Sequence, residues 1–302
     1  MYLPTIRQLQ YLIAVVELRH FGKAAERCFV TQSTLSAGIQ ELENILGAAV
    51  LERSKRKVIP TPLGLELVER AREVLSLSEG IVELARGEHA PLTGPLRLGV
   101  IPTIGPFLLP KVLPTLRRKF RQLELFLIED QTARLLERMS SGELDCAVLA
   151  LPYEMERMES QTFWSENFWV AFPKKHILNE VETVAAKDLP VDELLLLEEG
   201  HCFRDHALSA CRREVLSRNA SFQGTSLYTL MEMVAGGQGV TFLPDMAVHS
   251  SLGKQRGVEL RPLNSKGPHR DIALVWRSSF YRKKDMMVLA ETMGEIAESA
   301  YQ

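Results

Sequence analysis

The sequence predicts an α/β protein preceded by a small helical domain and one long helix. Apolar residues recur at helical spacing through the first sixty residues, and a proline-free helical pattern follows over residues 63–86. From residue 95 onward, short apolar runs alternate with helical segments, a pattern typical of α/β units around a largely parallel sheet. The length of 302 residues is enough for about two domains.

Composition and charge narrow the class of protein. Apolar residues make up 46% and charged residues 25% of the chain, which excludes a disordered chain, a collagen-like repeat and a small disulfide scaffold. No apolar run reaches the roughly 18 residues of a membrane span, and residues 1–19 lack the pattern of a signal peptide. We therefore expect a cytoplasmic protein with no membrane contact. Residues 1–62 hold eight Lys/Arg and five Asp/Glu, whereas the remainder holds 28 and 33, so a basic start precedes an acidic body.

The basic start has the pattern of a helix-turn-helix. Helices are predicted over residues 6–19, 22–28 and 34–46, with Thr31 as an N-cap and Gly47 as a left-handed C-terminal residue. Small polar side chains that can bind base edges or phosphates open the third helix: Thr31, Gln32, Ser33, Thr34 and Ser36. Glu41 and Glu43 lie further along and should face away from DNA. Two short strands, 50–53 and 57–60, should form a basic wing that places Arg53, Lys55 and Arg56 near backbone phosphates.

A long helix follows, opened by Pro62. The seam positions alternate in steps of four and three, as in a coiled coil, and are apolar except for an interruption at Ser78: Leu67, Ala71, Val74, Ser78, Ile81 and Ala85. A helix of roughly 24 residues is about 36 Å long, too long for a sixty-residue domain to cover one face of it. We expect a partner helix from a second subunit, and a hinge over residues 87–94.

The remaining segments complete the α/β pattern. Strands are predicted over 96–101, 123–129, 146–151, 169–172, 193–197, 240–242 and 272–276, and helices over 108–120, 133–140, 207–216, 227–235 and 285–301. In parallel sheets, ligands bind beyond the carboxyl ends of the strands. Thr103 follows the first of these strands and Thr132 the second, so both are candidate ligand contacts.

The four cysteines differ in their surroundings. Cys28 and Cys146 lie in apolar patterns and should be buried, inert thiols. Cys202 follows a polar turn and precedes a helical pattern, where the helix dipole favours thiolate. His201 and Arg204 can support that charge, but acidic neighbours (Glu198, Glu199 and Asp205) oppose it, so no strongly depressed pKa is assigned. A thiolate that meets peroxide gives a sulfenic acid, which a second thiol converts to a disulfide.

Two other kinds of chemistry deserve comparison. His201, Cys202, His206 and Cys211 are zinc-competent, but their spacing matches no zinc finger, and the adjacent His201 and Cys202 would not readily share one ion. The chain lacks a Gly-x-Ser-x-Gly elbow, a Walker A motif and a Gly-x-Gly-x-x-Gly turn. The glycine-rich segment 236–239 does not follow a predicted strand, as a phosphate-binding loop would require. We therefore expect no metal, no cofactor and no enzymatic activity.

Several motifs resemble a known family. Segments 24–25, 30–36, 39–43, 46–47 and 51–53 resemble the N-terminal module of LysR-type transcriptional regulators, although Ser33 stands where many members carry proline. Segments 99–106 and 144–151 are similar to the peroxide-sensing members of that family. The most specific match is Glu-Gly-His-Cys-Phe-Arg-Asp over 199–205, with a second cysteine nine residues after the first.

The resemblance implies a domain organisation. A winged helix-turn-helix domain would span residues 1–61, and a dimerising linker helix with a hinge would span 62–90. An α/β regulatory domain would span 91–302 as two Rossmann-like halves, similar to periplasmic binding proteins, with boundaries near 91–165 plus 270–302 and 166–269. A homotetramer that binds double-stranded promoter DNA is implied, with RNA polymerase as a further partner.

The resemblance also implies a redox role. It assigns Cys202 as the peroxide-reacting cysteine and Cys211 as its resolving partner. It places Thr103, Thr132 and His201 in the peroxide pocket and Arg270 near it, while Arg204 would support the thiolate. The expected function is control of oxidative-stress defence genes, as activator or repressor, through a reversible Cys202–Cys211 disulfide that glutathione or glutaredoxin resets. The alternative is a LysR-type regulator that responds to a small organic effector without redox chemistry.

Overall fold

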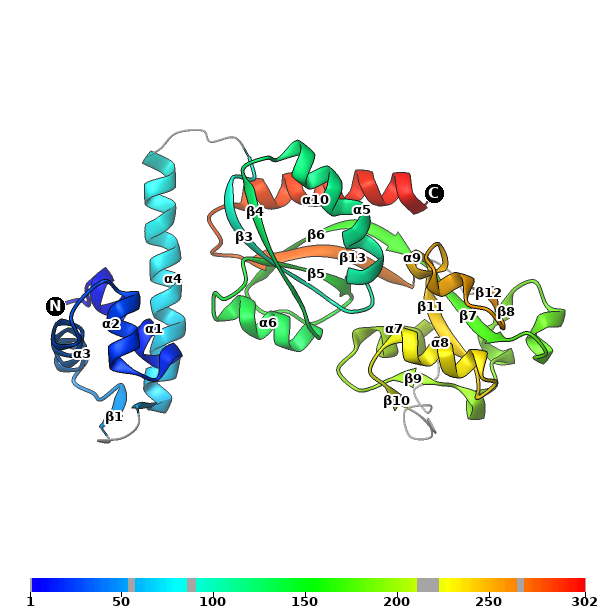
Figure 1. The fold of residues 1–302 in the computed structure, drawn as a ribbon, viewed down its shortest axis with the longest axis horizontal. Helices are drawn as coiled ribbons and strands as arrows, with labels where there is room; N and C mark the ends of the chain where they lie inside the picture. The colour runs from blue at the N-terminus through cyan, green and yellow to red at the C-terminus, as the bar shows by residue number, and fades with distance from the viewer. Residues whose placement is uncertain (1, 54–57, 86–90, 211–222, 265–268, 302) are drawn as a thin grey trace. The chain divides into compact units, whose positions relative to one another are not determined.

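The computed structural model describes residues 2–53, 58–85, 91–210, 223–264 and 269–301. The chain divides into two compact units, one formed mainly by residues 1–89 and the other by most of residues 90–302 (Figure 1). Within the described ranges, no helix is both long enough and apolar enough to cross a membrane.

The first unit contains the predicted helices and the predicted hairpin. Its elements are α1 (Ile6–Leu18), α2 (Phe21–Arg27), α3 (Gln32–Leu46), the antiparallel pair β1 (Leu51–Arg53) and β2 (Val58–Pro60), and α4 (Pro62–Ala85). The Thr31 side chain accepts a hydrogen bond from the Thr34 backbone N–H at 3.2 Å, which confirms it as the N-cap of α3. Gly47 ends α3 with a φ of 67°, a left-handed conformation that favours glycine.

Polar contacts tie the outer elements of this unit to its core. The Glu17 carboxylate of α1 accepts a hydrogen bond from Arg72 of α4 at 2.5 Å, and also pairs with Arg27. The Glu43 carboxylate of α3 accepts the backbone N–H groups of Val50 (3.0 Å) and Leu51 (3.4 Å). Glu43 therefore fixes the start of the wing to the third helix.

The apolar positions of α4 serve two surfaces. Ala71 is buried and belongs to the core of its own unit, as does Val68. Val74 is 42% exposed and Ile81 68% exposed, and Leu77 is exposed beside them. The predicted seam is therefore shared: Ala71 packs in the core of its own unit, whereas Val74 and Ile81 remain exposed.

The second unit contains a five-stranded sheet in its first lobe. The strands are β3 (Gly94–Val100), β4 (Leu123–Glu129), β5 (Cys146–Leu151), β6 (Met158–Glu166) and β13 (Arg270–Arg277), in the order β4-β3-β5-β13-β6. Helices α5 (Gly105–Lys119) and α10 (Lys283–Tyr301) lie on one face and α6 (Thr132–Ser140) on the other (Figure 1). Strands β3, β4 and β5 are parallel, whereas β13 is antiparallel to both of its neighbours.

The second lobe has a four-stranded sheet in the order β11-β7-β12-β8. Its strands are β7 (Phe168–Pro173), β8 (Val184–Ala185), β11 (Thr241–Pro244) and β12 (Val258–Asn264), with a short parallel pair, β9 (Leu196–Leu197) and β10 (Gln223–Gly224), nearby. Its helices are α7 (Cys202–Ala210), α8 (Leu227–Ala235) and α9 (Asp245–Val248), with short 3₁₀ turns at 177–180, 186–188, 191–193 and 252–254.

The topology departs from a largely parallel sheet. The prediction is correct for β3, β4 and β5 and for the β12–β8 and β9–β10 pairs. It is wrong for β13, which is antiparallel to β5 and β6, and for β7, which is antiparallel to β11 and β12. The chain enters the second lobe through Asn167, between β6 and β7, and returns to the first lobe between β12 and β13. A strand that returns across the same junction must run opposite to the strand that left, which accounts for the antiparallel β12 and β13.

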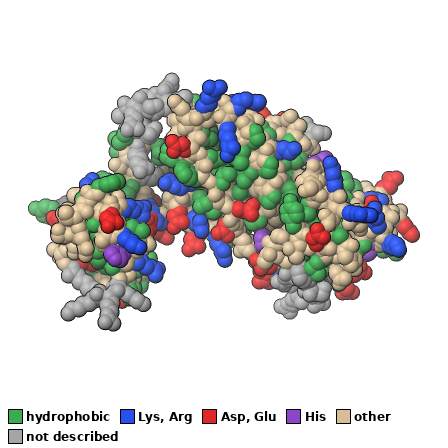
Figure 2. Space-filling model, viewed as in Figure 1, with side chains coloured by type: hydrophobic (Ala, Val, Ile, Leu, Met, Phe, Trp, Pro, Cys, Tyr) green, Lys and Arg blue, Asp and Glu red, His purple; other side chains and the backbone are tan. Residues whose placement is uncertain are grey.

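The surface of the second unit mixes charged and apolar side chains. On the face shown in Figure 2, Lys and Arg side chains are interspersed with Asp and Glu side chains. Apolar side chains are also exposed on this unit, and Phe126 and Leu127 of β4, at one edge of the sheet, are two of them.

Candidate functional site

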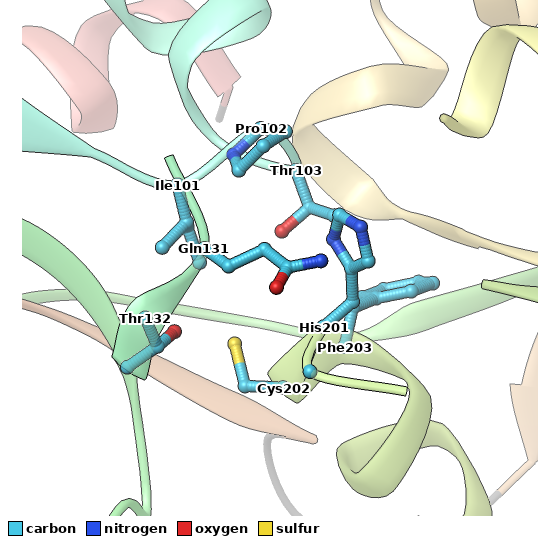
Figure 3. Close-up of a pocket in the computed structure, with 9 residues that line it drawn as sticks. Ile101, Pro102, Thr103, Gln131, Thr132, His201, Cys202 and Phe203 are labelled. Atoms are coloured by element: carbon cyan, nitrogen blue, oxygen red, sulfur yellow. The ribbon is translucent and has the colours of Figure 1, made fainter. Parts of the chain in front are cut away.

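Three helices of the second unit begin around one small pocket. Thr103 precedes α5 by two residues, Thr132 is the first residue of α6, and Cys202 is the first residue of α7. The first two come from one lobe and Cys202 from the other. Figure 3 shows the side chains converging, and the pocket is lined by Ile101, Pro102, Thr103, Gln131, Thr132, Gly200, His201, Cys202 and Phe203. Helix N-termini carry partial positive charge, so this arrangement favours an anion in the pocket.

The Cys202 thiol is buried, with 5% of the residue exposed. Its sulfur points toward Gln131 and Thr132 (Figure 3). Burial raises the pKa of the thiol, and Asp205 adds to this, while the Thr132 hydroxyl and the Arg270 guanidinium lower the pKa without cancelling the effect of burial. The reduced pocket therefore holds a protonated thiol next to groups that favour its anion.

Arg270 is fixed behind the pocket by groups from both lobes. Its guanidinium donates to the Thr103 hydroxyl oxygen at 2.9 Å and to the Thr103 carbonyl oxygen at 3.1 Å. It also forms a fully buried ion pair with Glu166, with a shortest N–O distance of 2.6 Å, and its carbon Cζ lies 5.1 Å from the centre of the Phe203 ring. Since Arg270 donates to the Thr103 oxygen, the hydrogen of that hydroxyl is left to point elsewhere.

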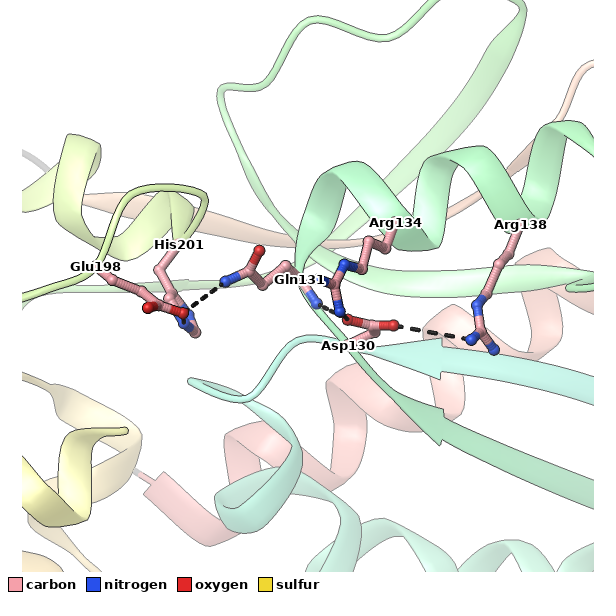
Figure 4. A network of polar contacts seen from close by, with 6 residues as sticks. All are labelled: Asp130, Gln131, Arg134, Arg138, Glu198 and His201. Carbon is pink, nitrogen blue, oxygen red and sulfur yellow. Dashed lines mark hydrogen bonds and ion pairs between the residues drawn. The ribbon is translucent and has the colours of Figure 1, made fainter. Parts of the chain in front are cut away.

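A polar network closes one side of the pocket (Figure 4). Gln131 Nε2 donates to Glu198 Oε1 at 3.2 Å, and His201 Nε2 lies 3.9 Å from the same oxygen. Burial lowers the pKa of His201, and the nearby Glu198 raises it by less, so the imidazole is neutral at pH 7.

The start of α6 is held in place by Asp130. Its carboxylate accepts the Gln131 backbone N–H at 2.9 Å and faces Arg134 (3.5 Å) and Arg138 (4.0 Å) along the helix (Figure 4). These contacts fix Gln131 and Thr132 at the pocket wall. The Thr132 hydroxyl is buried and, among the described residues, has no partner other than the Cys202 thiol.

The predicted pocket residues fall into three groups. Thr103, Thr132, His201 and Cys202 line one pocket, and Arg270 lies directly behind Thr103. Arg204 is buried on α7, but the cation that lowers the Cys202 pKa is Arg270, so a supporting role for Arg204 stays a prediction. Cys211 lies outside the described residues.

The other two cysteines differ from each other. Cys146 is fully buried at the start of β5, as predicted. Cys28 is only partly buried, because it lies in the turn that ends α2. Burial raises the pKa of Cys28 despite nearby Arg27 and Arg7, so this thiol is protonated as well.

Gln131 and Glu166, at and behind the pocket, escaped the sequence analysis, and His206 was considered there only as a possible zinc ligand. Gln131 precedes Thr132 at the end of β4, so the rule that led to Thr132 also applies to Gln131. Glu166 ends β6, a strand that was not predicted, and His206 lies in α7 one turn after Cys202. Their partners, Arg270 and Pro152, are distant in the sequence, so no local pattern indicates either contact.

The helix-turn-helix presents its predicted polar side chains to solvent. Thr31, Gln32, Ser33, Thr34 and Ser36 are exposed at the start of α3, while Leu35 between them is buried in the core. The Thr31 hydroxyl also contacts the hydroxyls of Ser33 (2.9 Å) and Thr34 (2.8 Å). Lys55 and Arg56, and the side chain of Arg53, lie outside the described part of the chain.

Within the described part of the chain, no group of three or more His, Cys, Asp or Glu residues is arranged to hold a metal ion.

Comparison with known proteins defines the class of this chain. Residues 6–65 match the bacterial regulatory helix-turn-helix proteins of the lysR family, and residues 89–297 match the LysR substrate-binding domain. The chain therefore belongs to the LysR family of bacterial transcriptional regulators.

Several relatives within that family carry specific names. A hydrogen peroxide-inducible genes activator from Pectobacterium carotovorum subsp. carotovorum is 42% identical over 96% of this chain and 96% of its own length. A full-length OxyR variant from Pseudomonas aeruginosa superposes with a TM-score of 0.82 at 37% identity, covering 97% of this chain and 98% of that one. A hydrogen peroxide-bound OxyR mutant from Corynebacterium glutamicum superposes with a TM-score of 0.67 at 33% identity, covering 99% and 94%.

Proposed function

We propose that this chain is a DNA-binding transcriptional regulator that senses hydrogen peroxide through Cys202 and controls oxidative-stress defence genes. The observation that carries the proposal is the pocket itself, where a buried thiol meets two threonine hydroxyls and three helix N-termini, with Arg270 behind them. The peroxide-related names of the relatives support the same function.

The first step is oxidation of Cys202. Its sulfur attacks one peroxide oxygen, the S–O bond forms and the O–O bond breaks, and the leaving hydroxide takes up the thiol proton as water. The hydroxyls of Thr103 and Thr132 can donate to and accept from peroxide oxygens, so they hold the molecule in line with the sulfur. Arg270 and the helix N-termini stabilise the negative charge that develops during the attack.

The second step is a disulfide between Cys202 and Cys211. The S–S bond forms, the S–O bond of the sulfenic acid breaks, and its hydroxyl leaves with the Cys211 proton as water. Thiol reductants such as glutathione or glutaredoxin then restore both thiols by exchange.

Helix α7 prevents this bond in the reduced arrangement. Cys202 and Ala210 are its first and last residues, which places their Cα atoms roughly 12 Å apart at 1.5 Å per residue. Cys211 is one residue further, and a single Cα–Cα step of about 3.8 Å cannot bring it closer than about 8 Å. A disulfide needs about 7 Å or less, so part of α7 must unwind during oxidation.

The first unit supplies the DNA-binding function in this proposal. The exposed side chains Gln32, Ser33 and Thr34 read base edges or phosphates, and the wing contacts the backbone. We assign the DNA-binding domain to residues 1–61, the linker to 62–90 and the regulatory domain to 91–302, divided near residues 165 and 270.

We infer oligomerisation from exposed apolar side chains in the C-terminal half of α4. Val74, Leu77 and Ile81 are exposed apolar side chains on a helix whose other half packs on its own unit. A second copy of this helix would cover them, which gives a dimer, and contacts between regulatory domains would extend it to a tetramer on promoter DNA that acts with RNA polymerase.

A small organic effector is the alternative signal. Even when open solvent at its mouth is counted, the space at the pocket is only about 170 Å³, whereas pockets for such ligands usually exceed roughly 300 Å³. The space behind it is filled by the buried side chains of Arg270, Phe168 and Phe203. This arrangement favours a molecule of the size of peroxide.

The test uses reduced full-length protein treated with stoichiometric hydrogen peroxide. Free thiols are counted without denaturation, and the footprint on promoter DNA is recorded before and after. We expect the loss of two thiols and a changed footprint, with neither in Cys202→Ser. A footprint that changes in Cys202→Ser, or a wild type that keeps all its thiols, would contradict the proposal.

A further inference from the structure

Helix α7 carries a second buried group one turn after Cys202. His206 is 6% exposed, and its Nε2 lies 2.9 Å from the carbonyl oxygen of Pro152. Pro152 belongs to the connection between β5 and β6 in the first lobe, whereas α7 belongs to the second lobe. Residues four apart share one face of a helix, so this hydrogen bond anchors the face that also presents Cys202.

The hydrogen bond defines the protonation state of His206. A carbonyl oxygen only accepts, so Nε2 carries the hydrogen and Nδ1 is bare in the neutral ring. Nδ1 is buried and has no partner among the described residues. A proton on Nδ1 would therefore be an unpaired buried N–H, which costs free energy.

The surroundings of the ring also favour its neutral form. Burial lowers the pKa of His206, and the Arg270 guanidinium of β13 lowers it further, while the Pro152 carbonyl and the Asp205 carboxylate of α7 raise it by less than burial lowers it. The neutral ring thus fits the packed arrangement of α7, and the protonated ring does not.

We propose that His206 is a positioning residue that holds α7, and with it Cys202, against the first lobe, and that its contact with Pro152 must break before the disulfide forms. The inference rests on the proposed redox function for its second half only. Loss of this hydrogen bond should make opening of α7 about fivefold more frequent, the size of effect typical of one hydrogen bond. The disulfide should then form faster, while formation of the sulfenic acid is unchanged or slower.

The first test needs no redox chemistry. Amide hydrogen exchange of α7 is measured in reduced full-length protein between pH 5.5 and 7.5, corrected for intrinsic exchange rates. His206→Phe keeps a buried ring without the donor, His206→Gln keeps an N–H at the position of Nε2 but does not titrate, and Ser209→Ala changes an exposed residue of the same helix. We expect about fivefold weaker protection in His206→Phe, and wild-type protection at pH 7.5 in His206→Gln and Ser209→Ala.

The pH profile separates positioning from a merely structural role. Wild-type α7 should lose protection as the pH falls below about 6.5. His206→Gln should show a smaller loss, because only His201, directly before the helix, then still takes up a proton on opening. Equal protection in His206→Phe and wild type, or the same pH profile in His206→Gln and wild type, would overturn the proposal. The His206→Gln profile remains decisive if His206→Phe does not fold.

The second test follows the two oxidation steps. Sulfenic acid formation is measured by trapping in a Cys211→Ser background, and disulfide formation by the loss of thiols in the native background. His206→Phe should form the disulfide about fivefold faster than the wild type, with no gain in the first step. An unchanged disulfide rate would overturn the proposal. A wild type that forms no disulfide would instead contradict the proposed function and would leave the hydrogen-exchange result to decide the role of His206.

Discussion

At the scale of single residues, the surroundings of Cys202 act on its thiol in opposite directions. Burial raises its pKa, and Thr132 and Arg270 lower it by less. The thiol therefore stays protonated before it reacts. Its interactions with Thr132 and Arg270 become more stabilising as negative charge develops on the reacting atoms. In the proposed function, selectivity for peroxide comes from Thr103 and Thr132, whose hydroxyls can bind its oxygens.

A first prediction concerns Thr132. Thr132→Val keeps the shape of the side chain and removes the hydroxyl, so the Cys202 pKa should rise further and oxidation by peroxide should slow about tenfold, as for a lost hydrogen bond to a charged group. Stopped-flow sulfenic acid trapping in a Cys211→Ser background measures the rate. Thr162→Val, at an exposed position of β6, is the control and should match the parent. Equal rates in the two variants would remove Thr132 from the account.

A second prediction concerns the pH dependence of stability. The pKa values of His201, His206 and His269 are each lowered, with burial as the largest cause. The unfolded chain, with histidine pKa values of about 6.5, takes up protons before the folded one, so stability is complete above pH 6.5 and is lost progressively below it. Urea unfolding of reduced protein between pH 5 and 8 gives the free energy of unfolding at each pH, and His206→Gln should make its dependence on pH less steep. A free energy of unfolding that does not change between pH 7 and 5.5 would contradict the prediction.

The residues of the site differ in how well the sequence predicts them. Thr103 and Thr132 are predictable because each directly follows a strand, and the carboxyl ends of parallel strands share one edge. Cys202 is predictable from its motif. Glu166 acts through Arg270, which is 104 residues away, so only the folded topology brings this ion pair together.

At the scale of elements, the proposed function requires α7 to unwind in part and α4 to contact a second copy of the chain. Helix α7 must lose part of its length before Cys202 can reach Cys211. Helix α4 is held to its own unit by Ala71 and by the Arg72–Glu17 ion pair, and leaves Val74 and Ile81 open. In the proposed function, α7 is the switch and α4 is the interface between subunits that transmits the change.

A third prediction follows for α4. Ile81→Glu should place a charge in the interface between two copies and shift the full-length protein toward monomer or dimer species of lower mass. Sedimentation velocity of reduced protein measures the effect. Ala71→Glu is a poor probe, because Ala71 is buried in its own unit and the variant would unfold that unit. A wild-type mass for Ile81→Glu and Val74→Glu alike would exclude this helix as the interface.

A fourth prediction concerns the DNA-binding unit. Arg53→Ala with Arg56→Ala should weaken binding to operator and random DNA equally, and should reduce the slope of log K against log salt by about 2, since phosphate contacts carry no sequence information. Ser33→Ala should instead reduce the discrimination between operator and random DNA. Fluorescence anisotropy at several salt concentrations measures both. An unchanged salt slope in the double variant would exclude the wing as a phosphate contact.

The elements that the sequence missed share a physical reason. Strand β6 contains several polar residues and lies at the edge of its sheet, where one side is open to solvent. Strand β12 contains Pro262, which lowers its apparent strand propensity. The helices of the first unit were predictable because their apolar spacing and their caps, Thr31 and Gly47, agree with each other.

At the scale of the whole molecule, the pocket lies where the two lobes of the regulatory unit join. Arg270 and Glu166 stand at the two crossings of the chain between the lobes, and Arg270 also holds Thr103 at the pocket. A change in α7 therefore acts at the point where the lobes are connected. In the proposed tetramer, a new arrangement of the regulatory domains changes the spacing of the DNA-binding domains and hence the footprint.

Peptide mapping by mass spectrometry, on full-length protein treated briefly with peroxide and in parallel with footprinting, tests the central claim most directly. The account predicts one cross-linked peptide joining Cys202 to Cys211, with Cys28 and Cys146 still reduced, in the same samples whose footprint has shifted. A shifted footprint in protein whose Cys211 remains a free thiol would contradict it.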